Sequence, residues 1–468
     1  MKHKVSKQLV SLVLSLIMMA AAPLAALAVD AVPITIPVDT YSPWAEVDVF
    51  MAKTAYGLGD ESTYSNYQAA LTAGKFMPVY EELAETFGVE GSFIPSGELI
   101  TRGEVVAAYY EIMTGALAKS VDEAAAFFVD AGLLAGRNAG DYGLDKACTV
   151  EEMIVFSDRV YEYLAYKAGK DSKGFFWEVR GGANKVYLLG SIHISDGSMY
   201  PLSKAIEGAF AKSKNLVVEA DIYGNMEIDQ MALFQKGMIP ADSGKTIKDF
   251  MAPELYEAYA SVCSSLGLPA EVYDYMKPWL ANIVMQGLAL TSGETEAQLG
   301  VDIHFLMKAY AANKNVIELE GAMFQYDMFA SFSDELQTAQ LASSLAALMP
   351  SEAQSADGAS SGEGQASDGN TAQQAVAMLL EIVKKGDDEA MTEILGVNTV
   401  YDDPLDIEFN TKVFTDRNKG MADKIIGFLG GESGKGDYFV VVGAGHMLGN
   451  EGIVALLSGK GYEVVRIK

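Results

Sequence analysis

Side chains that commonly carry metal and nucleophile chemistry are scarce in this chain, which has two cysteines and four histidines among 468 residues. Two cysteines cannot supply a disulfide framework. Cys148 and Cys263 also fall in different predicted domains, so we expect small buried residues rather than nucleophiles. The chain has no His-Glu-x-x-His segment, which excludes a thermolysin-like zinc protease. No Gly-x-Ser-x-Gly elbow accompanies the histidines, which argues against a serine hydrolase.

Basic residues are also few, because 34 Lys and Arg stand against 63 Asp and Glu, a formal net charge of −29. Phosphate backbones are bound by basic stripes, so this balance excludes nucleic acid as a partner. The acidic surplus favours a solvated surface or a cationic partner, and it also attracts divalent metal ions.

Long apolar runs are confined to the N-terminus. Lys2, Lys4 and Lys7 precede an apolar stretch from Leu9 to Ala22, and Ala26-Leu27-Ala28 has the small-x-small pattern of a cleavage site. These features predict a cleavable signal peptide over residues 1–28 and a secreted, extracellular protein. No later run is long enough to span a membrane.

The remaining chain divides by composition. Residues 29–167 are predicted to be mostly helical, residues 168–174 to be a polar linker, and residues 175–468 to form a second domain. Residues 351–372 are mainly Ser, Gly, Ala, Gln and acid, without a large apolar side chain. They predict a disordered insertion in that second domain.

Two helix-start signals lie 48 residues apart in the helical region. Thr101–Glu104 and Thr149–Glu152 each place Thr at the N-cap and Glu three residues later, which predicts two capping boxes and an internal repeat. With the Ala-rich and Gly-containing segment between them, they resemble S-layer homology modules, although Val150 stands where that family has Arg. The resemblance implies binding to a cell-wall polymer, for which the family usually uses three copies. Two are recognisable here, and a plain helical domain is the alternative.

The second domain alternates strands with helices. Strands are predicted at 185–190, 215–219, 315–319, 438–443 and 462–467, and helices between them include 202–213 and 418–429. This order predicts an α/β or α+β domain in which helices flank a mixed sheet.

Two Gly-x-x-His motifs follow apolar strands 253 residues apart. They are Gly190–His193 and Gly443–His446, and histidine is the commonest metal ligand and general base at neutral pH. Glycine permits positive φ and close backbone approach, so we expect the chain to turn sharply at the end of each of these two strands. A satisfied histidine at each strand end is the alternative interpretation.

Carboxylates follow two more of the predicted strands. Glu219 and Asp221 follow strand 215–219, and Glu318 and Glu320 follow strand 315–319. Ligands of open α/β sheets gather at the carboxyl ends of strands. Strand ends far apart in the sequence can therefore bring both histidines and a carboxylate together.

The order of motifs from Trp177 to Ile467 resembles the TraB/GumN family, which includes the Tiki-type metalloproteases. The blocks that carry the resemblance are Phe176–Val179 with Val186–His193, Leu216–Glu219, Lys277-Pro278-Trp279, Gly300-Val301-Asp302, Val316–Glu320 with Gln325, Lys385-Gly386-Asp387, Arg417-Asn418 and Val441–Gly449. Ser191 stands where the family often has Thr.

The family's marked site positions fall on four residues of this chain. The resemblance implies catalytic roles for His193, His446, Glu219 and Arg417, with His193, His446 and Glu219 as metal ligands. Asp302 and Glu320 fall on further polar positions and are expected to orient the others. His304 is not marked and is read as a bystander.

A mixed imidazole and carboxylate site suits Mn, Co, Zn or Fe, and does not favour Ca or Mg. The resulting hypothesis is a secreted, metal-dependent hydrolase, a peptidase, acting on a peptide or protein substrate. Two alternatives stay open. One is a non-catalytic protein that binds and shuts down pheromone-type peptides, as the TraB side of the family implies. The other is a cell-wall-associated structural protein, and the oligomeric state is also open.

Overall fold

The computed structural model describes residues 40–134, 141–265, 267–291, 297–348 and 371–468. These form two compact units. Among these residues, one unit comprises 40–171 with Gly197–Pro201, and the other comprises Ser172–Asp196 with the residues from Leu202 onward. The predicted signal peptide and residues 351–370 of the predicted insertion lie outside the described residues. Within the described part of the chain, no helix combines the length and apolar character needed to cross a membrane.

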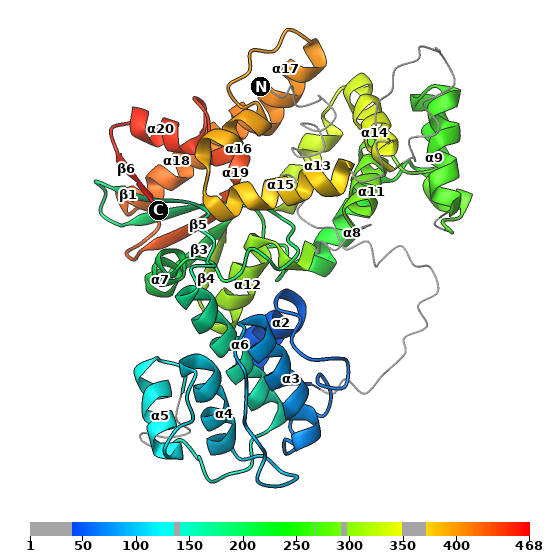
Figure 1. Cartoon of the computed structure of the whole chain (residues 1–468). Helices are drawn as coiled ribbons and strands as arrows, with labels where there is room; N and C mark the ends of the chain where they lie inside the picture. Colours follow the sequence, from blue (N-terminus) through cyan, green and yellow to red (C-terminus); the bar gives the residue numbers. More distant parts are fainter. Residues whose placement is uncertain (1–39, 135–140, 266, 292–296, 349–370) are drawn as a thin grey trace, which may run out of the picture. The chain divides into compact units, whose positions relative to one another are not determined.

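The first unit is helical, as predicted (Figure 1). Its elements are η2 (Pro43–Ala45), α2 (Glu46–Phe50), η3 (Met51–Ala55), α3 (Ala73–Thr86), α4 (Arg102–Thr114), α5 (Val121–Asp130) and α6 (Val150–Lys167). Both predicted capping boxes are confirmed. Thr101 caps α4 and Thr149 caps α6, each with its Glu partner.

Three short segments of this unit hydrogen-bond to one another in a closed ring. The Leu71 N–H donates to the Cys148 carbonyl at 2.7 Å, the Cys148 N–H to Ile100 at 2.9 Å, and the Ile100 N–H to Leu71 at 2.9 Å. All three side chains are fully buried, and each precedes a Thr at the N-cap of α3, α4 or α6. The unit therefore holds three related helix starts, one more than the sequence revealed. The third, at Thr72, lacks the Glu of a capping box.

The predicted linker, residues 168–174, contains the boundary between the two units. Gly169, at φ +67°, follows the last turn of α6. Lys173 and Gly174 donate backbone hydrogen bonds to Lys384 and Val383, so the end of this segment is tied into the second unit.

The second unit is built on one six-stranded sheet, with the strand order β4-β3-β5-β2-β1-β6. The strands are β1 (Phe175–Arg180), β2 (Val186–Ser191), β3 (Asn215–Val218), β4 (Asn315–Glu318), β5 (Tyr438–Gly443) and β6 (Glu463–Ile467). Strands β4, β3, β5 and β2 are parallel, whereas β1 is antiparallel to both β2 and β6. The predicted mixed sheet is confirmed, and all five predicted strands are present. Strand β1 was not among them.

Helices connect and cover these strands. They are α7 (Lys204–Lys212), α8 (Met226–Gly237), α9 (Pro253–Ser265), α10 (Ala270–Tyr273), α11 (Pro278–Thr291), α12 (Val301–Ala311), α13 (Ala322–Ala330), α14 (Asp334–Leu348), α15 (Thr371–Lys385), α16 (Asp388–Leu395), α17 (Pro404–Asn410), α18 (Asp416–Gly430), α19 (Ala444–Met447) and α20 (Ile453–Gly459), with short helices η4 (Ala241–Ser243), η5 (Ile247–Phe250), η6 (Ala297–Leu299) and η8 (Thr411–Thr415). Helix α15 includes residues 371 and 372, so the predicted insertion extends two residues too far.

Aromatic side chains seal both faces of the sheet. Phe439 of β5 meets Phe210 of α7 and Phe305 of α12, with ring centroids 5.5 and 4.8 Å away. Its neighbour Tyr438 points to the opposite face and stacks on Phe428 of α18 at 4.7 Å. Figure 1 shows the corresponding layers, with α7 and α12 on one side of the sheet and α18 and α20 on the other.

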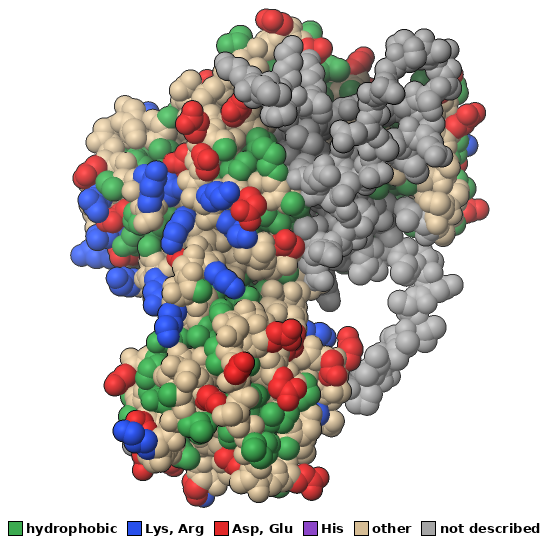
Figure 2. Space-filling view, in the orientation of Figure 1, with side chains coloured by type: hydrophobic (Ala, Val, Ile, Leu, Met, Phe, Trp, Pro, Cys, Tyr) green, Lys and Arg blue, Asp and Glu red, His purple; other side chains and the backbone are tan. Residues whose placement is uncertain are grey.

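Charge is unevenly spread over this structure. Figure 2 shows Lys and Arg side chains gathered around α7 and the β1–β6 edge of the sheet, whereas acidic side chains predominate on the visible face of the helical unit. Cys148 and Cys263 are both buried, as expected, and neither forms a disulfide in the described part of the chain.

Candidate active site

Three neighbouring parallel strands end at the same edge of the sheet. His193 follows β2, Glu219 follows β3, and His446 follows β5, which lies between the other two. Parallel strands present their carboxyl ends together. This topology explains how residues from 193 to 446 converge, as the sequence predicted.

The first glycine of the motif around His193 serves close packing. A Cβ on Gly190 would lie 3.0 Å from Phe175 Cβ and 3.1 Å from Ala444 Cα. Any side chain there would push the two histidine motifs apart. The expectation of positive φ was wrong, because Gly443 has φ −47° and Gly190 is not among the described residues with positive φ.

Glu219 is the centre of the site and is buried. Its Oε1 accepts the backbone N–H of Gly443 at 2.7 Å. Its Oε2 accepts from Arg417 Nη2 at 2.5 Å and from Gln325 Nε2 at 3.3 Å. Burial opposes ionisation, but the charge of Arg417, helped by the hydrogen bond from the Gly443 N–H, outweighs it and holds the pKa of Glu219 well below its usual range.

Arg417 of α18 joins two carboxylates from neighbouring strand ends. Besides Glu219, it donates through Nε and Nη2 to Glu320, at 2.7 to 3.0 Å. Its partners come from other elements, not from an acidic neighbour on its own helix. None of the described residues accepts a hydrogen bond from Nη1, so that end of the guanidinium remains available to a ligand.

His446 is fully buried and fixed at one ring nitrogen. Asn418 Oδ1 lies 2.7 Å from Nδ1 and can only accept, so the proton is on Nδ1 and Nε2 carries a lone pair. Nε2 has no hydrogen-bond partner among the described residues and lies 4.0 Å from Glu219 Oε2. Burial, and next the charge of Arg417, lower the pKa of His446 to about 3, so the ring stays neutral.

His193 is buried and contacts a charged partner. Its Nδ1 lies 2.8 Å from Asp302 Oδ2, while Asp302 Oδ1 has no partner among the described residues. Gly300 permits this approach, because a Cβ on it would lie 2.9 Å from the carbonyl of His193. Asp302 and Glu320, expected as orienting groups, therefore contact His193 and Arg417.

The remaining candidate residues lie elsewhere. His304 Nε2 is 3.2 Å from Glu207, outside this cluster, consistent with a bystander. Asp221 and Glu318 form a separate contact, in which the Asp221 N–H donates to Glu318 Oε1 at 2.7 Å.

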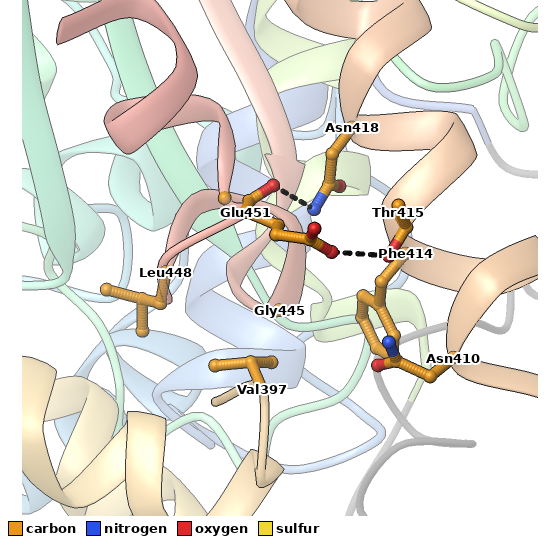
Figure 3. Close-up of a pocket in the computed structure, with 9 residues that line it drawn as sticks. Val397, Asn410, Phe414, Thr415, Asn418, Gly445, Leu448 and Glu451 are labelled. Atoms are coloured by element: carbon orange, nitrogen blue, oxygen red, sulfur yellow. Dashed lines mark hydrogen bonds between the residues drawn. The ribbon is translucent and has the colours of Figure 1, made fainter. Parts of the chain in front are cut away.

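A small pocket lies beside the Asn418 end of the site. Its lining includes Phe414, Asn418 and Gly445. Figure 3 shows Asn418 and Thr415 converging on Glu451, with Asn418 Nδ2 donating to the Glu451 carbonyl at 2.9 Å. Phe414 and Thr415 belong to η8, the π-helical turn that precedes α18. Such turns are often found at functional sites.

Sequence reasoning missed two contributors to the site, Asn418 and Gln325. Both stand in segments that carried the family resemblance, but neither had an assigned role. Their contacts with His446 and Glu219 join different elements, and only the fold brings these together. The position of Asn418, next to Arg417 at the start of a helix, was the available signal.

The second unit matches a known family. The TraB/PrgY/gumN family profile covers residues 175–466. The chain belongs to the TraB/PrgY/gumN family. The match begins after the helical unit, so the S-layer resemblance of that unit stays a prediction.

Curated relatives are distant. The chain is 23% identical over 154 residues to the uncharacterized protein YbaP of Escherichia coli strain K12, which covers 33% of this chain and 55% of YbaP. A metalloprotease TIKI homolog of Nematostella vectensis is 38% identical over 64 residues, 14% of this chain and 13% of that protein. The chain thus spans about half the length of YbaP and a small part of the TIKI homolog. No solved structure matches.

Proposed function

We propose that this protein is a secreted, metal-dependent hydrolase that cleaves peptides. The observation that carries the proposal is the pair of buried histidines at adjacent strand ends, each fixed at Nδ1 by a side chain of another element. Metal-binding histidines typically have such partners. The similarity to a metalloprotease TIKI homolog supports the same chemistry.

The residues fit a divalent cation in two respects. His446 Nε2 is a buried lone pair without a partner in the described structure. The cluster also holds three carboxylates (Glu219, Glu320 and Asp302), an acidic environment that favours a cation. We propose that His193 and His446 hold the ion, with Mn, Co, Zn or Fe the metals that suit such ligands.

Glu219 is a less suitable ligand than the sequence suggested. Its two oxygens already accept from Gly443, Arg417 and Gln325. Within the described residues, no three His, Cys, Asp or Glu side chains are arranged to hold a metal. The ligand set of His193, His446 and Glu219 is therefore not preassembled.

The side chains of the site suggest distinct roles in hydrolysis. A bound divalent metal would lower the pKa of a water molecule and polarise a carbonyl. Glu219 is held ionised, so it enters as a proton acceptor and not as a donor. Arg417 Nη1 offers N–H donors to the oxyanion that develops on the carbonyl oxygen.

Metal content of the purified full-length protein tests this proposal. We expect a near-stoichiometric transition metal in the wild type and its loss in the His193→Ala/His446→Ala double variant. His304→Ala is the matched control, because it removes a buried histidine outside the site and should retain the metal. No metal in the wild type after incubation with Mn, Co or Zn would refute the proposal.

A second candidate is peptide binding without turnover. It is favoured because both oxygens of Glu219 already accept hydrogen bonds, from Arg417, Gln325 and Gly443. Metal-dependent cleavage of a peptide would exclude it, and tight binding without cleavage would support it.

For the helical unit we propose association with a cell-wall polymer. Support comes from the S-layer resemblance and from the three related helix starts around the ring of Leu71, Ile100 and Cys148. Full-length protein should sediment with purified cell walls, and a variant lacking residues 40–171 should not. Equal sedimentation of both would refute this role.

A further inference from the structure

Two helices next to the site expose an unusual number of large apolar side chains. Helix α8 follows β3 and helix α13 follows β4, and the two pack against each other. Ile228 and Met231 of α8 are 70% and 75% exposed, and Met323 and Phe324 of α13 are 43% and 48% exposed. We call these four residues the α8–α13 surface. Clustered exposed apolar side chains mark interaction sites.

Helix α13 connects the α8–α13 surface to the active site, because it carries both the exposed Phe324 and the buried Gln325. Phe324 is followed by Gln325, whose Nε2 donates to Glu219 Oε2 at 3.3 Å. An ion pair between Lys236 and Asp327 ties the two helices together.

Uncompensated negative charge lies close by. Asp221, Asp229 and Glu318 have no ion-pair partner among the described residues. Burial, and next the charges of Glu318 and Asp221, raise the pKa of Asp229. Asp229 belongs to α8, between the exposed Ile228 and Met231, so apolar and acidic features share one helix.

We propose that the α8–α13 surface binds the substrate, a peptide that carries both apolar and basic side chains. The inference rests on the proposed peptidase function and adds the substrate class. Apolar side chains of the peptide would cover Ile228, Met231, Met323 and Phe324, and flexible methionines adapt to varied partners. Its Lys or Arg residues would pair with the exposed Glu318 and the partly exposed Asp229, which have no ion-pair partner among the described residues.

Binding of fluorescein-labelled peptides to the full-length protein, measured by anisotropy after metal removal, tests the inference without cleavage. Three probes of about a dozen residues are compared, in which Leu alternates with Lys, Leu with Glu, or Ser with Lys. We expect the Leu–Lys peptide to bind roughly tenfold more tightly than either other probe. Raising the salt concentration should reduce that preference over the Leu–Glu peptide.

Variants test whether the α8–α13 surface binds the peptide. Ile228→Ser/Met231→Ser should weaken Leu–Lys binding about tenfold, and Asp229→Asn should reduce the preference for Lys over Glu. Val400→Ser and Asp402→Asn are matched controls, because both residues are exposed and lie outside this surface. Equal weakening by the controls, or equal binding of the Leu–Glu peptide, would overturn the inference.

Restoring the metal separates this inference from the proposed function. Cleavage of all three peptides at similar rates would leave the hydrolase proposal standing and refute the substrate class. Preferential binding of the Leu–Lys peptide without cleavage would support the binding role of the α8–α13 surface and refute the hydrolase proposal.

Discussion

The two Gly-x-x-His motifs share a sequence pattern and a place on the sheet, but they differ in surroundings. His446 is 0% exposed, is partnered by the neutral Asn418, and packs its ring near Phe414 at 5.3 Å. His193 is 7% exposed and is partnered by the carboxylate of Asp302. The duplication therefore supplies two imidazoles in one place without supplying two equivalent residues.

The difference follows from what comes after each strand. After β5 the chain enters the short helix α19, with Gly443 at its N-cap, which places His446 inside the structure. After β2 it enters an irregular segment, and His193 meets the first turn of α12. Each environment sets the chemistry of its ring, and the following predictions test that difference.

The largest effect is expected at Arg417, which pairs with the two carboxylates Glu219 and Glu320 beside the motifs. Arg417→Met would leave Glu219 and Glu320 buried without a cation, costing about 3–5 kcal/mol of unfolding free energy in urea titrations. Arg180→Met, which breaks a half-exposed pair with Glu178, should have a much smaller effect, because solvent screens that pair. Equal costs would show that the buried cluster is not electrostatically coupled.

Exchanging the histidine partners tests whether the two imidazoles differ in metal binding. Asp302→Asn should lower metal affinity about 10- to 100-fold, because it removes the charged partner of His193. Asn418→Asp gives His446 a charged partner and should not lower affinity to the same extent. Competition with a chromophoric chelator measures both, and an equal loss in the two variants would contradict the distinction.

Acid should destabilise the metal-free protein through His446. Its pKa is about 3 in the folded state and about 6.5 when unfolded, so the unfolded state binds more protons between these values. The stabilisation is complete well above pH 6.5 and is lost as pH falls towards 3, by about 2 kcal/mol between pH 7.5 and 5.

Urea unfolding at pH 7.5 and pH 5 measures this loss. The variant His446→Asn should show a smaller decrease. Burial also lowers the pKa of His304, which contributes with the same sign in both proteins, so the comparison isolates His446.

The smallest effect is expected from separating the motifs sterically. Gly190→Ala places a Cβ against Phe175 and Ala444 and should cost about 1–2 kcal/mol in urea unfolding. Gly208→Ala, in helix α7 with open space around it, should stabilise by up to about 1 kcal/mol. If Gly190→Ala left the free energy of unfolding unchanged, the packing role of this glycine would be refuted.

Local patterns predicted much of the fold. Apolar runs such as Val186–Leu189 and Phe439–Val442 identified their strands, because buried parallel strands need continuous apolar sequence. Strand β1, Phe175–Arg180, was missed as a strand although its sequence carried the family resemblance. The third helix start, at Thr72, was missed because it has no capping Glu.

The site was predictable where strand ends place residues, and less so where helices contribute. Glu219 and the histidines follow directly from strands β3, β2 and β5. The roles of Asn418 and Gln325 depend on how α18 and α13 pack over the sheet edge, which no local pattern contains. The same limit explains why Glu219 was expected as a metal ligand before its bond to Arg417 was visible.

The strand order also has a consequence for how the chain assembles. Strand β5 lies between β3 and β2, yet it is formed by residues 438–443, near the C-terminal end. Until that segment arrives, β1–β2 and β3–β4 are separate two-stranded pairs, and neither pair is stable alone in water. The three strand ends that carry His193, Glu219 and His446 are therefore joined only after residues 438–446 have been synthesised.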